Sequence, residues 1–142
     1  MDQVLIRKNP CYCINLRQAA NSITRYYDNV FKNLGITVTQ FSLLNEIKYF
    51  GICSKSQLSE QAQLDKSTIT RNLLVLKRKG FIEDIADEDS RESKIMLTCV
   101  GIKKIEEGMS FWNEAQTHFE KKIGKEKMKE LRKILNLLIN EG

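Results

Sequence analysis

The sequence lacks any apolar run approaching the roughly 20 residues that span a bilayer, which excludes a transmembrane helix. The stretch from Met1 to Pro10 lacks the apolar core of a signal peptide, so we expect a cytoplasmic protein with no membrane partner. The four cysteines follow no zinc-finger or thioredoxin-type spacing, so we expect free thiols at Cys11, Cys13, Cys53 and Cys99.

Catalytic motifs are also missing. The chain has one histidine, His118, and it lacks a glycine-rich phosphate loop and a nucleophile elbow. A Cys-x-Cys pair at Cys11 and Cys13 differs from the Cys-x-x-Cys spacing of thiol oxidoreductases, which makes that activity the least favoured alternative. The sequence therefore predicts no enzyme, no cofactor and no metal site.

Positive charge is present but unevenly distributed. The net charge is +5, and the segment 55–80 contains six basic residues against two acidic ones, a balance of +4. A basic segment is compatible with a nucleic-acid partner, although many basic proteins bind none.

The first half of the chain predicts helices. Apolar residues recur at steps of three and four over 11–34, the pattern of a helix with one buried face. Thr37 and Gln40 then form a capping-box pattern that starts a second helix, which we expect to end at Gly51.

A short helix, a tight turn and a longer helix follow. Ser54 repeats the capping pattern before a helix over about 56–61, and Asp65 can cap a helix over about 66–79. In the longer helix the apolar residues form one stripe, and the polar residues of its N-terminal half lie largely outside that stripe. This arrangement is the pattern of a helix-turn-helix unit.

Beyond Gly80 the pattern changes to two short strands, about 81–86 and 93–98, around a polar hairpin tip. Thr98 can cap a long fifth helix, and Gly124 separates it from a last helix. The predicted fold class is mainly α with a small β-hairpin wing. No repeat or linker interrupts the chain, so we expect a single domain over 1–142.

The polar half of the longer helix is the candidate DNA-reading surface. A helix fits the major groove of B-DNA, where hydroxyl groups reach base edges or phosphates and an arginine grips guanine or phosphate. The alternative is a solvated face without a ligand. We expect double-stranded DNA as partner, with a candidate contact set of Lys55, Ser56, Lys66, Ser67, Thr68, Thr70, Arg71, Arg91 and Lys94.

Arg91 belongs to this set because it lies in the hairpin tip. Asp89 and Arg91 are two residues apart, and an ion pair between them would hold the arginine outward. A projecting guanidinium suits the negative potential of a narrow minor groove. The alternative is an exposed ion pair of little energetic consequence.

The sequence resembles the MarR family of bacterial and archaeal regulators over nearly its whole length. The resemblance is carried by Gly35-Ile36-Thr37, Gln40-Phe41, Leu58-Ser59, Asp65-Lys66-Ser67-Thr68-Ile69-Thr70-Arg71, Lys79-Gly80-Phe81-Ile82, Asp89, Arg91, Leu97-Thr98 and Gly101.

The resemblance implies a triangular homodimer that represses transcription from a pseudo-palindromic operator. It implies a winged helix-turn-helix DNA-binding lobe over about 37–98 and a helical dimerisation region over about 11–34 and 99–142. Ser67, Thr68, Thr70 and Arg71 would enter the major groove, and Arg91 the minor groove. Apolar stripes on both terminal helices independently favour a second copy as their cover.

One departure from the family concerns the wing. Residues 81–98 contain six acidic residues against Arg91 and Lys94, a balance of −4. This charge weakens phosphate attraction around the wing and leaves a second alternative, a winged-helix protein-interaction module that does not bind DNA.

The signal that would release DNA is predicted in two forms. By resemblance to peroxide-sensing members, Cys13 occupies the sensing position, with Cys11 beside it and Tyr27 placed to bond the sulfur across the dimer; the second tyrosine of that pattern is replaced by Val38. Alternatively the cysteines are packed interface residues, or metal ligands together with His118. The second form is a small aromatic effector in a crevice lined by Tyr12, Tyr26, Tyr27, Phe31, Phe111 and Trp112.

Overall fold

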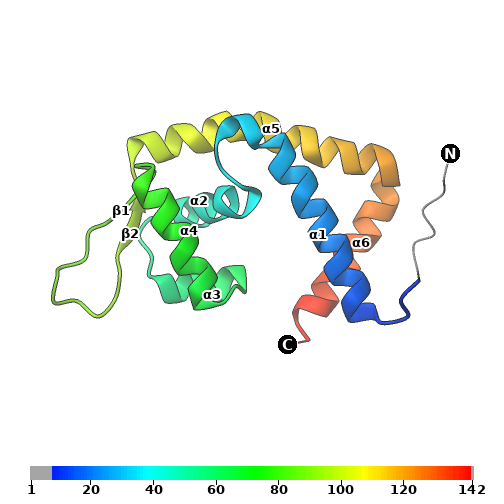
Figure 1. Cartoon of the computed structure of the whole chain (residues 1–142), viewed down its shortest axis with the longest axis horizontal. Coiled ribbons are helices and arrows are strands. Elements are labelled where there is room, and N and C mark those ends of the chain that lie inside the picture. The colour runs from blue at the N-terminus through cyan, green and yellow to red at the C-terminus, as the bar shows by residue number, and fades with distance from the viewer. Residues whose placement is uncertain (1–7, 142) are drawn as a thin grey trace.

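A long helix, α5 (Cys99–Ile123), spans the molecule and joins two groups of elements (Figure 1). The computed structural model describes residues 8–141; residues 1–7, part of the segment screened for a signal peptide, and Gly142 lie outside the described residues. One group comprises α2 (Val38–Phe50), α3 (Lys55–Ala62), α4 (Lys66–Arg78), β1 (Ile82–Asp84) and β2 (Ile95–Leu97). The other comprises α1 (Tyr12–Val30) and α6 (Lys125–Ile139). The mainly helical fold with one hairpin confirms the predicted class.

Side-chain caps start the helices where the sequence predicts. Thr37 Oγ1 accepts from the Gln40 backbone N–H at 3.2 Å and Gln40 Oε1 accepts from the Thr37 N–H at 3.1 Å, a complete capping box. Ser54 and Gln57 form the same box at α3. At α5 the Thr98 hydroxyl accepts from the Gly101 N–H at 3.1 Å. Each cap satisfies N–H groups that have no partner inside the helix.

The predicted end of the first helix and the predicted strand lengths are wrong. The first helix ends at Val30 rather than Leu34, and a 3-10 turn, η1 (Lys32–Leu34), follows because the Leu34 N–H bonds to the Phe31 carbonyl at 2.8 Å. The strands have three residues each, paired antiparallel with Ile82 opposite Leu97. Backbone pairing continues one residue beyond each end, because the Thr98 N–H donates to the Phe81 carbonyl at 3.0 Å and the Ile85 N–H donates to the Lys94 carbonyl at 2.8 Å. Past these residues the Thr98 hydroxyl caps α5, and the Ala86 N–H donates to the Asp84 carboxylate instead of across the hairpin.

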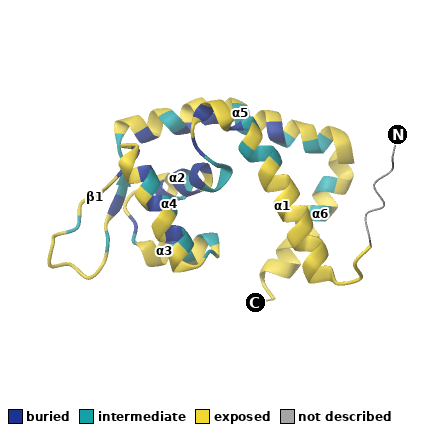
Figure 2. Cartoon of the chain, in the orientation of Figure 1, coloured by how far each residue is buried: buried dark blue, intermediate teal, exposed yellow. Residues whose placement is uncertain are grey.

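The hydrophobic core lies between α2, α4, the hairpin and the first half of α5 (Figure 2). Its fully buried large side chains are Phe31, Leu43, Leu44, Ile47, Leu58, Ile69, Leu76 and Ile105. Burying side chains of this size stabilises a fold by roughly 1.5–3 kcal/mol each. The core therefore holds the helix-turn-helix unit and the root of the hairpin as one body.

Two glycines let α5 approach this core closely. A Cβ on Gly101 would lie 2.0 Å from the Phe81 carbonyl oxygen, and a Cβ on Gly108 would lie 2.3 Å from Phe41 Cε2. Neither contact is tolerated by real side chains, so only glycine lets α5 pack at this distance at these two positions.

Helices α1 and α6 contrast with the core. Every residue of α1 and α6 is described, and none of them is buried (Figure 2). The expected apolar face of α1 is covered only near its C-terminal end, since Leu16 and Ile23 are 42% and 40% exposed. None of the described helices has the length and apolar character needed to cross a membrane.

Candidate nucleic-acid interface

The turn between α3 and α4 is fixed by three local interactions. Gln63 adopts a left-handed conformation (φ 52°) at the end of α3, and the Ser59 hydroxyl donates to the Leu64 carbonyl at 2.6 Å. The Asp65 carboxylate then accepts from the Thr68 N–H at 2.7 Å and from the Ser67 hydroxyl at 3.0 Å. These bonds, those from Thr68 foremost, lower the pKa of Asp65, so its ionised form is favoured at the start of α4.

Helix α4 has one buried and one exposed side, as its sequence predicts. Ile69, Leu73 and Leu76 are buried, whereas Lys66, Ser67, Thr70 and Arg71 are exposed and Thr68 is half-buried. The Arg71 guanidinium donates to the Thr68 hydroxyl at 3.3 Å, which directs the arginine along the exposed face. The polar half of α4 is thus largely exposed in the described part of the chain.

A groove of about 540 Å³ runs between the start of α3, α4 and the wing, which comprises β1, β2 and the loop 85–94 between them. It brings together five residues of the predicted contact set: Lys55, Ser56, Lys66, Thr70 and Arg91. Lys77 also lines the groove and was not predicted to do so. Residues from Ser54 to Ser93 therefore meet around one groove.

The other four predicted residues lie outside the groove. Ser67, Thr68 and Arg71 project from α4 beside it, whereas Lys94 sits at the return of the wing, where its backbone pairs with Ile85 at 2.8 Å. The predicted contact set thus divides into residues that line the groove, residues on the exposed face of α4 beside it, and Lys94 at the return of the wing.

The wing carries Arg91 without the predicted ion pair. Among residues 8–141 the ion pair found within 4 Å is Lys104–Glu107, so the predicted Asp89–Arg91 pair is wrong. Both side chains are exposed at the tip, where water solvates each charge and a surface pair contributes little. The groove also contains the acidic wing residues Asp84, Asp87, Glu88 and Glu92, so one wall is basic and the other largely acidic.

A buried polar bridge that sequence reasoning missed connects α2 to α4. Gln40 is 8% exposed, and its amide donates to Asn72 Oδ1 at 3.3 Å while its oxygen serves the α2 cap. Asn72 in turn donates to the Thr68 carbonyl at 2.9 Å. The capping signal at Gln40 was visible in the sequence, but nothing local indicates its second partner 32 residues away.

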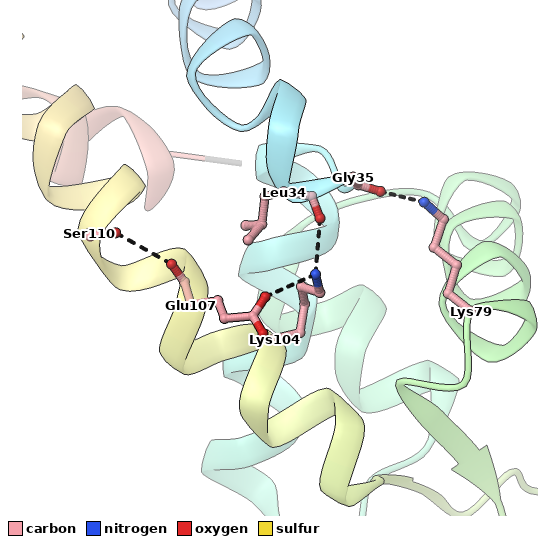
Figure 3. A network of polar contacts seen from close by, with 6 residues as sticks. All are labelled: Leu34, Gly35, Lys79, Lys104, Glu107 and Ser110. Carbon is pink, nitrogen blue, oxygen red and sulfur yellow. Dashed lines mark hydrogen bonds and ion pairs between the residues drawn. The ribbon is translucent and has the colours of Figure 1, made fainter.

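The corner formed by η1 and Gly35 joins this lobe to the long helix (Figure 3). The Lys104 ammonium, from α5, donates to the Leu34 carbonyl at 3.1 Å, pairs with Glu107 at 3.1 Å and lies 5.5 Å from the centre of the Phe81 ring. The Lys79 ammonium, just past α4, donates to the Gly35 carbonyl. Lys104 of α5 and Lys79, just past α4, therefore both donate to backbone carbonyls of this corner, which links the position of α4 to that of α5.

The cysteines occupy different environments. Cys11 is the N-cap of α1 without a side-chain cap bond, Cys13 lies in its first turn, and both are exposed, as is Cys99. Cys53 is buried, and burial raises the pKa of its thiol to about 11. All four are free thiols, as predicted. Residues 8–141 contain no cluster of three metal-ligating side chains.

Tyr27 and His118 have partners inside this chain. The Tyr27 hydroxyl donates to Gln116 Oε1, and desolvation, with a smaller contribution from Glu120, raises the pKa of Tyr27. The His118 ring stacks on Tyr26 with centroids 4.2 Å apart. The bond of Tyr27 to a cysteine across a dimer stays a prediction.

A second cavity, of about 440 Å³, lies between α1, α2 and α5. Of the six aromatic residues predicted to line such a crevice, only Tyr27 and Trp112 do. Phe31 is part of the core, Phe111 packs against it, Tyr26 stacks on His118, and Tyr12 is 85% exposed. The remaining lining comes from Val38, Phe41, Ser42, Asn45, Glu46, Met109 and Gln116.

Comparison with known proteins identifies the family. The MarR family model matches residues 36–93. The transcriptional regulator MosR of M. tuberculosis, solved in complex with DNA, is 30% identical, with 89% of this chain and 92% of MosR covered at a TM-score of 0.77. The chain belongs to the MarR family. This confirms the predicted resemblance and the prediction of a regulator rather than an enzyme.

Two further proteins are similar to this MarR-family chain, over 65% and 94% of its length. It is 25% identical over 92 residues to YwoH of Bacillus subtilis, described as an uncharacterized HTH-type transcriptional regulator, covering 65% of this chain and 67% of YwoH. The S. aureus MepR–DNA complex has the same fold, with a TM-score of 0.79, 21% identity, and 94% and 100% of the two chains covered.

Proposed function

We propose that this MarR-family chain is a repressor that binds a pseudo-palindromic operator as a homodimer. The groove of about 540 Å³ carries the proposal, because it assembles basic and hydroxyl side chains from α3, α4 and the wing beside the exposed half of α4. Supporting observations are its 30% identity to MosR, which was solved with DNA, and the fold shared with the MepR–DNA complex.

In the proposed complex the N-terminal half of α4 enters the major groove. Thr70 and Arg71, exposed on this half, would contact bases, and Lys55 and Lys66, near helix starts, would contact phosphates. Arg91, on the wing, would reach the adjacent minor groove. The acidic wall of the groove limits phosphate attraction on the wing side, so most of the electrostatic affinity arises from α3 and α4.

The proposed dimer uses α1, α5 and α6. Large apolar side chains remain exposed on these helices in the single chain: Ile14, Leu16, Ile23, Ile102, Met109, Ile123, Ile134, Leu135, Leu137, Leu138 and Ile139. A second copy related by a two-fold axis would cover such faces and would place two α4 helices to read two half-sites.

Release of DNA is proposed to follow from one of two signals. An oxidant can reach Cys13 and Cys11, because both thiols are exposed at the start of α1. Alternatively, a small aromatic molecule would bind in the cavity of about 440 Å³ between α1, α2 and α5, where Trp112 and Tyr27 provide aromatic surface.

The test is a binding titration with the protein's own promoter fragment at two salt concentrations, with and without hydroperoxide. We expect tight, salt-sensitive binding. Arg71→Ala should weaken specific binding by about 1–3 kcal/mol, since Arg71 would read a base. Lys121→Ala, which removes the same charge from an exposed position on α5, is the control and should bind like the wild type.

Each outcome has a separate meaning. Unchanged affinity in Arg71→Ala removes that residue from the base-reading set. Binding that hydroperoxide abolishes in the wild type but not in Cys13→Ser assigns the signal to the thiol, and binding that it leaves unchanged points to the cavity. No binding at either salt concentration would contradict an operator in this promoter and leave two candidates, a distant operator or the protein-interaction module with its acidic wing.

A further inference from the structure

The outer part of the wing is held by few interactions. Within residues 8–141, the loop 86–92 makes no hydrogen bond to α3 or α4. Ser90 bonds only inside the loop, to the Asp87 carbonyl at 2.9 Å and the Glu92 carbonyl at 3.0 Å. The position of Arg91 over the groove is therefore set where the loop leaves and rejoins the sheet.

Two side chains hold the root of the wing, the place where the loop leaves and rejoins the sheet. One Asp84 carboxylate oxygen accepts from the Ala86 N–H at 3.0 Å, just after β1, and from the Lys94 N–H at 3.0 Å, just before β2. The Ser93 hydroxyl accepts at 3.0 Å from the backbone N–H of Lys55, the first residue of α3, which has no partner inside its helix. Asp84 thus ties the two arms of the wing together, and Ser93 ties the returning arm to α3.

We infer that Asp84 is the positioning residue of the wing, closing its root so that Arg91 is held against the groove. The inference rests on the proposed function and specifies how its wing contact is achieved. The carboxylate is ionised at neutral pH, because its bonds from Ala86 and Lys94, and the nearby charges of Lys77 and Lys55, lower its pKa.

Charge alone gives the opposite expectation. Asp84 lines the groove, so a DNA phosphate there would be repelled by its charge, and neutralising it should tighten binding. If Asp84 positions the wing, removing its acceptor should weaken binding despite that gain. The two explanations therefore predict different signs for the same substitution.

A charge-matched pair of variants separates them. Asp84→Asn and Asp84→Ala both remove one negative charge, but only the asparagine oxygen can still accept from the two N–H groups. On the promoter fragment we expect Asp84→Ala to bind about tenfold more weakly than Asp84→Asn, the effect of about one to two lost hydrogen bonds. In an Arg91→Ala background the two should bind equally, because no wing arginine remains to be positioned.

A second measurement does not require DNA. Trypsin should cleave after Arg91 faster in Asp84→Ala than in Asp84→Asn, because the open wing exposes the bond more often. Equal cleavage and equal affinity in the two variants would overturn the inference. A binding difference that persists without Arg91 would also overturn it, since the loss would then be general. If no variant binds DNA while cleavage still differs, the proposed function fails and the positioning of the wing stands.

Discussion

Replacing Gly101 with alanine tests the contact between α5 and Phe81, the residue before β1. The added Cβ would lie 2.0 Å from the Phe81 carbonyl oxygen and 2.9 Å from its carbonyl carbon. Because this obstacle is backbone, no change of rotamer relieves it. Ordinary contacts begin at 3.4 Å, so the start of α5 must retreat by about 1.4 Å.

The expected loss follows from three contributions. Overpacking of this kind costs about 1–3 kcal/mol. The retreat also lengthens the bond from the Thr98 N–H to the Phe81 carbonyl, now 3.0 Å, and a lost hydrogen bond costs about 0.5–1.5 kcal/mol. Alanine recovers about 1 kcal/mol of helix propensity. We expect a net decrease of about 0.5–3.5 kcal/mol in the free energy of unfolding.

The assay is urea unfolding followed by circular dichroism at one fixed protein concentration. Thr117→Ala is the control, because it raises helix propensity at an exposed position of the same helix. Gly108→Ala should cost less than Gly101→Ala, since its obstacle is the edge of the Phe41 ring, which can tilt. A Gly101→Ala protein as stable as the Thr117→Ala control would refute the packing argument.

Two further predictions concern the thiols and the cavity. Brief treatment with iodoacetamide, followed by mass spectrometry, should label Cys11, Cys13 and Cys99 but leave Cys53 unmodified. The free energy of unfolding should also decrease between about pH 8.5, the unfolded thiol pKa, and the folded pKa of about 11, because only the unfolded Cys53 thiol loses its proton in this range. The decrease should be shallower in Cys53→Ala. Equal labelling of all four, or the same pH slope in both proteins, would contradict the burial. For the cavity, salicylate as a probe should quench Trp112 fluorescence and weaken promoter binding, whereas quenching without any change in DNA affinity would separate the cavity from regulation.

The sequence predicts the helices of this fold because their starts are encoded locally. Thr37, Ser54, Asp65 and Thr98 each cap the helix that the spacing assigns to them. A cap requires only that a side-chain oxygen lie next to its own backbone, so the information lies within four residues. The exposed polar half of α4 follows from the same local pattern.

Contacts between distant segments are not encoded in this local way. The second bond of Gln40, to Asn72, depends on how α2 crosses α4. The role of Asp84 depends on the two arms of the wing lying side by side, since its carboxylate binds an N–H group of each arm. The prediction of an Asp89–Arg91 ion pair was wrong for the converse reason, since proximity in sequence does not fix the positions of two exposed side chains. Predicting these features requires the tertiary structure.

The lack of buried residues in α1 and α6 has a consequence for how much active protein a cell holds. In a homodimer these helices would obtain most of their packing from the second copy, so folding and assembly would form one equilibrium. Each tenfold rise in protein concentration would then stabilise the folded dimer by about 1.4 kcal/mol. When diluted, such a repressor would lose operator occupancy more steeply than a dimer that stays folded, because dilution lowers the folded fraction as well as the total concentration.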